Sequence, residues 1–482
     1  MTRPNIVFIM SDDHAAHAIS AYGSRVNTTP HLDRIAREGV RCDAAFCTNS
    51  ICSPSRASIL TGTYSHVNGV TSIVSRFDHA TRTFPAVLRE HGYATGMFGK
   101  WHLGESGVSL PQDFDAWCVF PGQGEYHDPM MITPAGEERV PGYATDVVTD
   151  MSLDWIDAQD ADQPFCALVH HKAPHRPWQP DPKHADLYPV GSIPEPETLL
   201  DDYATRSRAV REATMTLADD LDIAVDIKEP VPEHLQGPEN REARIRWVYQ
   251  RYLRDYLQCV QSIDDNVGRL LDHLERTGRA ENTIVVYTSD QGFFLGDHGW
   301  YDKRFIYDES LQMPLLIRWP ARLPAGTELG EILTNVDLAA TLLDACGIGA
   351  DALAEELPQQ QGRSFLHLLA GEQDESWPQS MYYRYWEHDS EPHHVWSHYG
   401  VRTTRHKLVY FYNAGLGTDA AADTAYPPEW EMYDLEADPH ELHNIADDPA
   451  HAPLRRELEA ELARLQAHYR DEPYVAPAGR AS

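Results

Sequence analysis

The sequence predicts an α/β protein in which a large domain built on a mixed sheet precedes a smaller antiparallel α+β module. Several short, almost continuous apolar runs end in polar residues, which is the pattern of strands buried on both faces of a sheet. Helical patterns separate these runs. After about residue 378 the sequence pattern changes to short, aromatic-rich stretches that favour an antiparallel sheet. We therefore expect one domain over residues 1–377 and a second over residues 378–482.

Composition limits the possible partners. The formal net charge of −34 argues against nucleic acid and anionic membranes as partners, so a site for an anion must be a local group of basic residues. The seven cysteines are odd in number and show no zinc-type spacing, which favours reduced thiols. The apolar run Ile6–Met10 is too short for a secretory signal, and no stretch is apolar enough to span a bilayer. We expect a cytoplasmic location.

Two of the predicted strands, the first one and the most apolar one, end in candidate metal ligands. Asp12 and Asp13 follow the run that begins at Asn5, and Asp290 and Gln291 follow the run Thr283–Ser289. In open α/β sheets, ligands bind beyond the carboxyl ends of strands. A solvated turn is the alternative for the Asp-Asp pair alone. Because all four residues offer oxygen ligands, they suit a hard cation, calcium more than zinc.

A helix start is predicted around Cys52. Ser53 can cap the helix, Pro54 suits its first position, and Gly62 can end it. Cys52 then lies at the positive end of the helix, where an anion is stabilised, and Arg56 can reach toward the same anion. A half-buried structural cysteine is an equal alternative for these residues alone.

Two further predicted strands end in basic residues. The run Tyr93–Gly99 ends at Lys100 and His102, which share a face if the chain stays extended. The run Phe165–His170 leads into a proline-rich loop that contains His175. Residues 180–242 are polar and acidic and predict a surface excursion. A long helix is expected at Arg244–Arg276, with Asp264, Asp265 and Asn266 on a solvated face.

Five segments, in order, resemble the motifs of the type I sulfatases. They are Cys52-Ser53-Pro54-Ser55-Arg56 with Leu60-Thr61-Gly62, Gly99-Lys100-Trp101-His102-Leu103-Gly104, Ala173-Pro174-His175, Asp290-Gln291-Gly292 with Gly296-Asp297-His298-Gly299 and Lys303, and the turn Tyr433–Pro439. Gln291 departs from the pattern, because asparagine is commonest there. The resemblance implies an alkaline-phosphatase-like fold and sulfatase activity. It also implies that a formylglycine-generating enzyme oxidises Cys52 to formylglycine.

The resemblance implies a role for each matched residue. One hydroxyl of the hydrated formylglycine attacks sulfur while basic side chains neutralise the sulfate oxygens. His175 and Lys303 assist the leaving oxygen, and His102 takes the proton of the second hydroxyl. The implied catalytic residues are Cys52, Arg56, Lys100, His102, His175 and Lys303. The implied ligands of one calcium ion are Asp12, Asp13, Cys52, Asp290 and Gln291.

The substrate is expected to be a sulfated sugar. The segment Trp386–Arg402 is rich in aromatic and imidazole groups, which suit hydroxyl-bearing substrates, and it resembles bacterial sulfatases acting on 6-sulfated N-acetylglucosamine. We place His298, His394 and His398 at the rim of the site, with Trp178 nearby. The alternatives are an aryl or alkyl sulfatase, a phosphate or phosphonate ester hydrolase of the same superfamily, and a binding protein on a disabled sulfatase fold.

Overall fold

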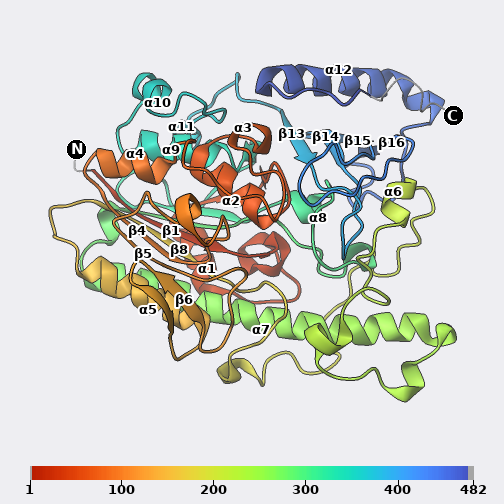
Figure 1. The fold of residues 1–482 in the computed structure, drawn as a ribbon, viewed down its shortest axis with the longest axis horizontal. Helices are drawn as coiled ribbons and strands as arrows, with labels where there is room; N and C mark the ends of the chain where they lie inside the picture. Colours follow the sequence, from red (N-terminus) through yellow and green to blue (C-terminus); the bar gives the residue numbers. More distant parts are fainter. Residues whose placement is uncertain (1–2, 476–482) are drawn as a thin grey trace.

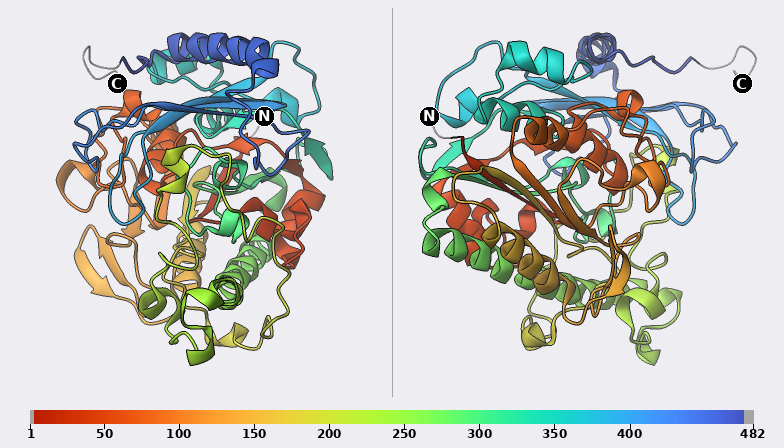
Figure 2. Two further views of the ribbon diagram at one scale, coloured as in Figure 1. Left: turned by 90° about the vertical axis from the view of Figure 1, so that its right-hand side faces the viewer. Right: turned by 60° about the vertical axis from the view of Figure 1, so that its left-hand side comes forward.

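The computed structural model describes residues 3–475, in which helices cover both faces of one large mixed sheet (Figures 1 and 2). This sheet confirms the predicted α/β class. From edge to edge its ten described strands are β11 (Thr327–Leu329), β2 (Val40–Cys42), β10 (Leu315–Arg318), β9 (Thr283–Ser289), β1 (Asn5–Ser11), β8 (Phe165–His170), β4 (Ala94–Gly99), β5 (Ala116–Val119), β6 (Met130–Thr133) and β7 (Gly136–Arg139).

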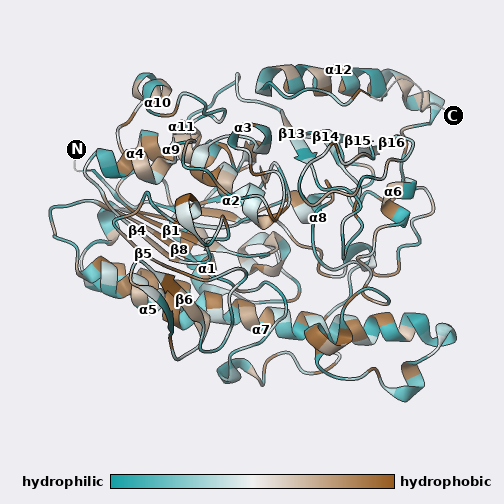
Figure 3. Cartoon of the chain, in the orientation of Figure 1, coloured by the Kyte–Doolittle hydropathy of each residue, from teal (hydrophilic) through white to brown (hydrophobic). Residues whose placement is uncertain are grey.

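Strand β1 lies at the centre of the core. It pairs in parallel with β8 on one side and with β9 on the other. Ile6 and Phe8 belong to the apolar cluster on one face of the sheet, and Val7 and Ile9 belong to the cluster on the other face. The central strands are accordingly hydrophobic along their length in Figure 3. The prediction of a strand buried on both faces is confirmed.

Two helical layers complete the first domain. The long helix α7 runs along one edge of the molecule in Figure 1 and packs against α1 and α5. The opposite layer includes α2, α4 and α9. The helices of this domain are α1 (Pro30–Glu38), α2 (Cys52–Thr61), α3 (Ser65–Asn68), α4 (Phe84–Glu90), α5 (Ala144–Asp157), α6 (Arg208–Arg211), α7 (Arg241–Arg276), α8 (Asp308–Leu311), α9 (Asp337–Ala345), α10 (Ala350–Glu356) and α11 (Leu366–Leu369).

One prediction on α7 is wrong. Asp264 was expected on a solvated face, but its side chain is buried and accepts hydrogen bonds from the backbone N–H groups of His31 and Leu32. These donors belong to the first turn of α1, which has no intrahelical partner for them. Asp264 therefore caps a neighbouring helix, and Asn266 is buried as well.

A second, four-stranded antiparallel sheet follows, as predicted. Helix α12 covers one of its faces, and the other face packs on aromatic residues of the first domain, including Phe294 and Phe305. The predicted boundary at 377/378 precedes this sheet and stays a prediction. The elements are β13 (Ser380–Tyr385), β14 (His398–Thr403), β15 (His406–Phe411), β16 (Glu429–Asp434) and α12 (Ala452–Tyr469).

The chain ends and the thiols complete the description. Asp471, which follows α12, is buried and accepts hydrogen bonds from Tyr382 and Arg384. Residues 476–482 lie outside the described residues. All seven cysteines are free and buried. Within residues 3–475, no helix combines the length and the apolar character needed to cross a membrane.

Candidate active site

The four predicted metal ligands meet where two adjacent strands end. Ser11 pairs with Ser289 at the last register position of β1 and β9, so the residues that follow emerge side by side. Carboxylate oxygens of Asp12, Asp13 and Asp290 lie within 4.8 Å of one another. The amide of Gln291 donates a hydrogen bond of 2.5 Å to Asp13 Oδ1. All four side chains are fully buried, so they form one compact set of oxygen atoms.

This oxygen set fits a hard divalent cation. Among the described residues, Asp12 Oδ1 and Gln291 Oε1 are buried without a hydrogen-bond partner, which is costly unless something else satisfies them. Burial and neighbouring carboxylates, with Lys303 opposing them, raise the pKa of Asp13 to about 7. Burial and Asp12 likewise raise the pKa of Asp290 to about 6, with Arg56 opposing them. A cation such as Ca²⁺ would satisfy the two free oxygens and relieve the repulsion.

Each carboxylate of the set also has one cationic partner. Lys303 Nζ lies 2.6 Å and 2.8 Å from the two oxygens of Asp13. Burial alone would raise the pKa of Asp12, but Lys100 and other nearby cationic groups hold it well below its usual range. Arg56 donates to Asp290, and its predicted role toward an anion stays untested. The three pairs are Asp12 with Lys100, Asp13 with Lys303 and Asp290 with Arg56.

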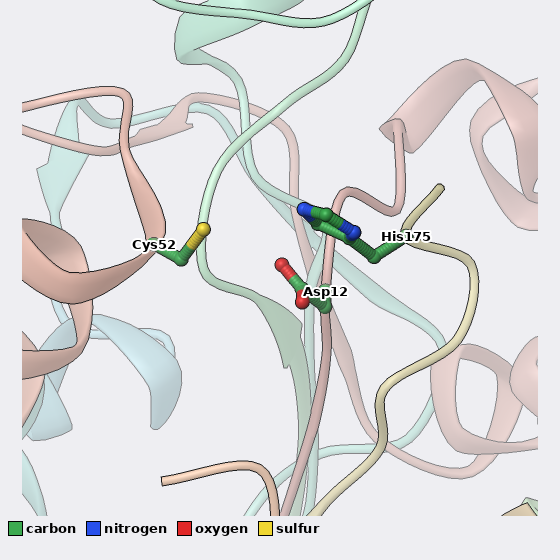
Figure 4. A group of neighbouring side chains, drawn as sticks. All are labelled: Asp12, Cys52 and His175. Atoms are coloured by element: carbon green, nitrogen blue, oxygen red, sulfur yellow. The ribbon is translucent and has the colours of Figure 1, made fainter. Parts of the chain in front are cut away.

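Cys52 faces this set from the first residue of α2. Its sulfur, a carboxylate oxygen of Asp12 and a ring nitrogen of His175 lie within 4.8 Å of one another, and the three side chains point toward a common space (Figure 4). The predicted cap is wrong, because Ile51 is the N-cap and Ser53 Oγ donates instead to the carbonyl of His102, at 2.8 Å. Burial raises the pKa of the Cys52 thiol to about 12, so it is protonated near neutral pH and is a poor nucleophile.

Two histidines adjoin Cys52. His175 Nδ1 lies 2.5 Å from the carbonyl oxygen of Arg176, which can only accept, so Nδ1 carries the proton and Nε2 faces the site. His102 Nδ1 lies 3.3 Å from Ser53 Oγ. The predicted reason for its placement is wrong, because β4 ends at Gly99 and His102 has a φ of 55°. A turn brings His102 to Ser53, the residue after Cys52.

The predicted rim residues differ in exposure. His298 and His398 are fully buried, so neither lies at an open rim. Because Cys52 and Lys100 are equally buried, contact of these two histidines with a substrate stays a prediction. His298 Nδ1 lies 2.9 Å from Asp201 Oδ2, whereas the ring of His398 packs among aromatic residues of the C-terminal sheet. Trp178 is buried too. His394 is partly exposed and pairs with Asp389.

A buried polar cluster lies beside Lys303. Sequence reasoning missed Asp302 and Arg304, whereas Glu387 and His393 belong to the run Trp386–Arg402 that was expected to contact the substrate. Asp302 Oδ2 lies 3.2 Å from His393 Nε2, and Arg304 Nη1 lies 3.1 Å from Glu387 Oε2. In the described structure, Arg304 Nε and His393 Nδ1 are buried without a hydrogen-bond partner. Asp302 and Arg304 flank Lys303 in the sequence, which is a signal that the motif reading did not use.

Comparisons with known proteins agree with this geometry. The family profile described as "Sulfatase" matches residues 4–348, and the profile described as "N-sulphoglucosamine sulphohydrolase, C-terminal" matches residues 296–468. The chain is 41% identical to an N-acetylglucosamine-6-O-sulfatase of Bacteroides thetaiotaomicron, over 97% of this chain and 87% of that protein. It is 28% identical to a Homo sapiens N-acetylglucosamine-6-sulfatase, over 78% of this chain and 66% of that protein.

Solved structures give the same result. One protein, solved in complex with its substrate D-glucosamine-2-N,6-O-disulfate, matches with a TM-score of 0.88 and 39% identity over 99% of this chain and all of that chain. A phosphonate monoester hydrolase from Silicibacter pomeroyi matches with a TM-score of 0.74 at 21% identity, over 98% of this chain and 96% of that chain, and shows the fold alone. The profile match across most of the chain and the high-identity relative together show that this chain belongs to the alkaline-phosphatase-like sulfatase family, the hydrolases of sulfate esters.

Proposed function

We propose that this sulfatase releases the 6-O-sulfate of N-acetylglucosamine or of a closely related glucosamine sulfate. The main support is the 41% identity, over nearly the whole chain, to a relative named N-acetylglucosamine-6-O-sulfatase. The similarity to a structure holding a glucosamine disulfate supports the same substrate class. Both matches cover nearly the whole chain, the C-terminal module included.

We assign the catalytic chemistry to Cys52 after its oxidation to formylglycine. The hydrated aldehyde supplies a nucleophilic hydroxyl, which the plain thiol of Cys52 does not offer. Ca²⁺ held by Asp12, Asp13, Asp290 and Gln291, with the modified Cys52 as the further ligand, would stabilise negative charge at that position. Lys100, Lys303 and Arg56 surround the same space and neutralise the sulfate oxygens.

The two histidines move the protons. Because Nδ1 of His175 is held by the carbonyl of Arg176, Nε2 is the nitrogen that can deliver a proton to the leaving sugar oxygen. His102 lies beside Ser53, next to the nucleophile position, and accepts the proton of the second hydroxyl.

The cluster of Asp302, Arg304, Glu387 and His393 supplies contacts for the sugar. It is adjacent to Lys303, and at Arg304 Nε it offers a donor without a hydrogen-bond partner among the described residues. Because His393 Nε2 donates to Asp302, it also offers an acceptor at His393 Nδ1. Such mixed donors and acceptors suit sugar hydroxyl groups. We add this cluster to the expected substrate contacts, and His298, His394 and His398 stay untested candidates.

A substrate panel tests the proposal. We expect release of sulfate from N-acetylglucosamine 6-sulfate, with much slower turnover of 4-sulfated N-acetylgalactosamine. Turnover of an aryl sulfate alone would favour the aryl sulfatase alternative, and faster turnover of phosphate or phosphonate esters would favour the other superfamily activity. Cys52→Ala is the matched control, and it should remove turnover of every ester.

Maturation is tested separately by peptide mass spectrometry. We expect the peptide containing Cys52 to carry formylglycine or its hydrate when the protein is made together with a formylglycine-generating enzyme. Full activity of a preparation that contains only unmodified Cys52 would contradict the assignment. The cytoplasmic location stays a prediction.

A further inference from the structure

The polar excursion between β8 and α7 contains a segment that contacts both loops bearing catalytic residues. This segment, residues 198–228, is here called the brace. One loop, residues 172–178, carries His175, and the other, residues 291–303, carries Gln291 and Lys303. In Figure 1 the brace helix α6 lies beside β16, so the segment also reaches the C-terminal module.

The brace holds the first loop through a buried ion pair. Asp226, fully buried in the turn Ile223–Ile227, receives two hydrogen bonds from the guanidinium of Arg176, the one from Nε being 3.0 Å long. Arg176 follows His175 directly, and its backbone carbonyl accepts the Nδ1 proton of that histidine. Asp226 therefore holds the side chain of Arg176, and the carbonyl of Arg176 orients the ring of His175.

The brace holds the second loop through backbone pairing. Leu217 N donates to the carbonyl of Gly299 at 2.9 Å, and Tyr301 N donates to the carbonyl of Met215 at 3.0 Å. These bonds frame an isolated antiparallel bridge between Thr216 and Trp300. They end two residues before Lys303, so the pairing restricts where that lysine can lie.

His298 adds a side-chain clamp to the same loop. Its ring lies 2.9 Å from Asp201, and its backbone N–H donates to Thr198 Oγ1 at 2.9 Å. Its carbonyl accepts a hydrogen bond from Tyr203. All three partners belong to the brace, which explains a buried polar histidine in a loop that the sequence had suggested as substrate-facing.

The two loops also meet through the brace. The guanidinium carbon of Arg176 lies 5.3 Å from the ring centroid of Tyr301, and the hydroxyl of Tyr301 donates to the carbonyl of Asp220 at 3.1 Å. Arg176 thus contacts Asp226 of the brace and Tyr301 of the opposite loop at once. A shift of the brace would move both loops together.

We propose that the brace sets the distance between His175 and Lys303, and that Asp226 is a positioning residue that acts on His175 through Arg176. The proposal rests on the role proposed above for His175 in protonating the leaving oxygen. Misplacing a catalytic group by a fraction of an ångström to one ångström lowers a rate by roughly tenfold to a hundredfold.

The test is Asp226→Asn, measured on two substrates. A sugar sulfate has a poor leaving group that needs a proton, whereas 4-nitrophenyl sulfate leaves without one. We expect kcat for the sugar sulfate to fall by roughly tenfold or more while KM changes by less than about twofold. We expect a much smaller change in kcat for 4-nitrophenyl sulfate. A merely structural role would lower both rates equally.

Glu38→Gln is the matched control, because Glu38 pairs with Arg318 at 2.8 Å. Arg318 pairs with Val285 near the start of β9, remote from the catalytic strand ends. This variant makes the same carboxylate-to-amide change and should leave both rates unchanged. Arg176→Lys, which loses the paired guanidinium contacts but keeps the charge, repeats the test if Asp226→Asn does not fold.

A double variant separates the proposal from its premise. In a His175→Ala background, Asp226→Asn should lower the remaining sugar-sulfate turnover no further, because both changes remove the same contribution. Full additivity, or an unchanged kcat in both Asp226→Asn and Arg176→Lys, would overturn the positioning role. Normal sugar-sulfate turnover by His175→Ala alone would instead refute the role proposed for His175.

Discussion

Removing the divalent cation should abolish the affinity of the site for sulfate. Without an ion, the three carboxylates of the site are matched by three cations, so Lys100, Lys303 and Arg56 are already engaged. At a pH above the raised pKa of Asp13, about 7, all three carboxylates are ionised and the cluster sums to zero charge. A bound divalent cation brings the sum to +2 and competes for the same carboxylates. The lysines then become available to an anion.

The expected size of this coupling follows from the charges. One pair of unit charges about 5 Å apart contributes about 3 kcal/mol at an effective dielectric constant of about 20. We take the energy of one such pair as the net gain in binding free energy. Sulfate should then bind the calcium-loaded protein at least about 100-fold more tightly than the chelated protein. By linkage, sulfate must tighten calcium binding by the same factor.

Isothermal titration calorimetry with inorganic sulfate measures this directly. Protein treated with EGTA and protein loaded with calcium are compared at one ionic strength, with chloride as the control anion because sulfate itself changes screening. We expect sulfate binding only to the loaded protein within the accessible concentration range. Equal affinity in the two states would refute the argument that the carboxylates occupy the sulfate-binding cations.

Four further predictions follow from individual contacts. Asp290→Ala should remove bound calcium, measured by metal analysis, together with sulfate-ester turnover, because it deletes one carboxylate of the oxygen set. Asp264→Ala should lower stability by about 1–2 kcal/mol in urea melts without changing kcat/KM, because it leaves the first turn of α1 uncapped. Gly99→Ala should lower the melting temperature sharply, because φ is 97° and an added Cβ would meet the carbonyl oxygen of His170. His398→Ala should lower the melting temperature and change the turnover of sugar and aryl sulfates equally, because the buried ring is hydrogen-bonded to the carbonyl of Trp396. Selective loss of sugar-sulfate turnover would instead support a contact between His398 and the sugar.

The sequence was most informative where strand ends fix positions. Asp12 and Asp290 are far apart in the chain, yet two apolar runs of parallel-strand type predict that they meet, and β1 and β9 bring them together. The length and composition of a short, continuous apolar run indicate a buried strand, and the polar residues that follow mark its carboxyl end. Residues placed directly after such a run are therefore well predicted.

Side-chain partners were not predictable in the same way. The direction of Arg56 depends on the carboxylate of Asp290, which lies on another element, and local spacing contains no such information. His298 follows a motif in the sequence, but its burial depends on Asp201 in an irregular segment without periodicity. Asp264 looked solvated because the helix pattern does not show that the N-terminus of α1 lies against it.

The two domains contribute different polar groups to the site. In the first domain, the carboxylates and cations at the strand ends pair with one another, and we assign them to the metal and the sulfate; Cys52 and Asp12 are fully buried. The C-terminal module contributes Glu387 and His393, which contact Arg304 and Asp302 on either side of Lys303. Glu387 also accepts the backbone N–H of Ile73 at 2.8 Å, which ties the module to the first domain at the site itself. Differences in sugar preference can therefore arise in the module and in Asp302 and Arg304 while the strand-end chemistry stays the same, because these residues lie beside Lys303 and supply none of the strand-end carboxylates.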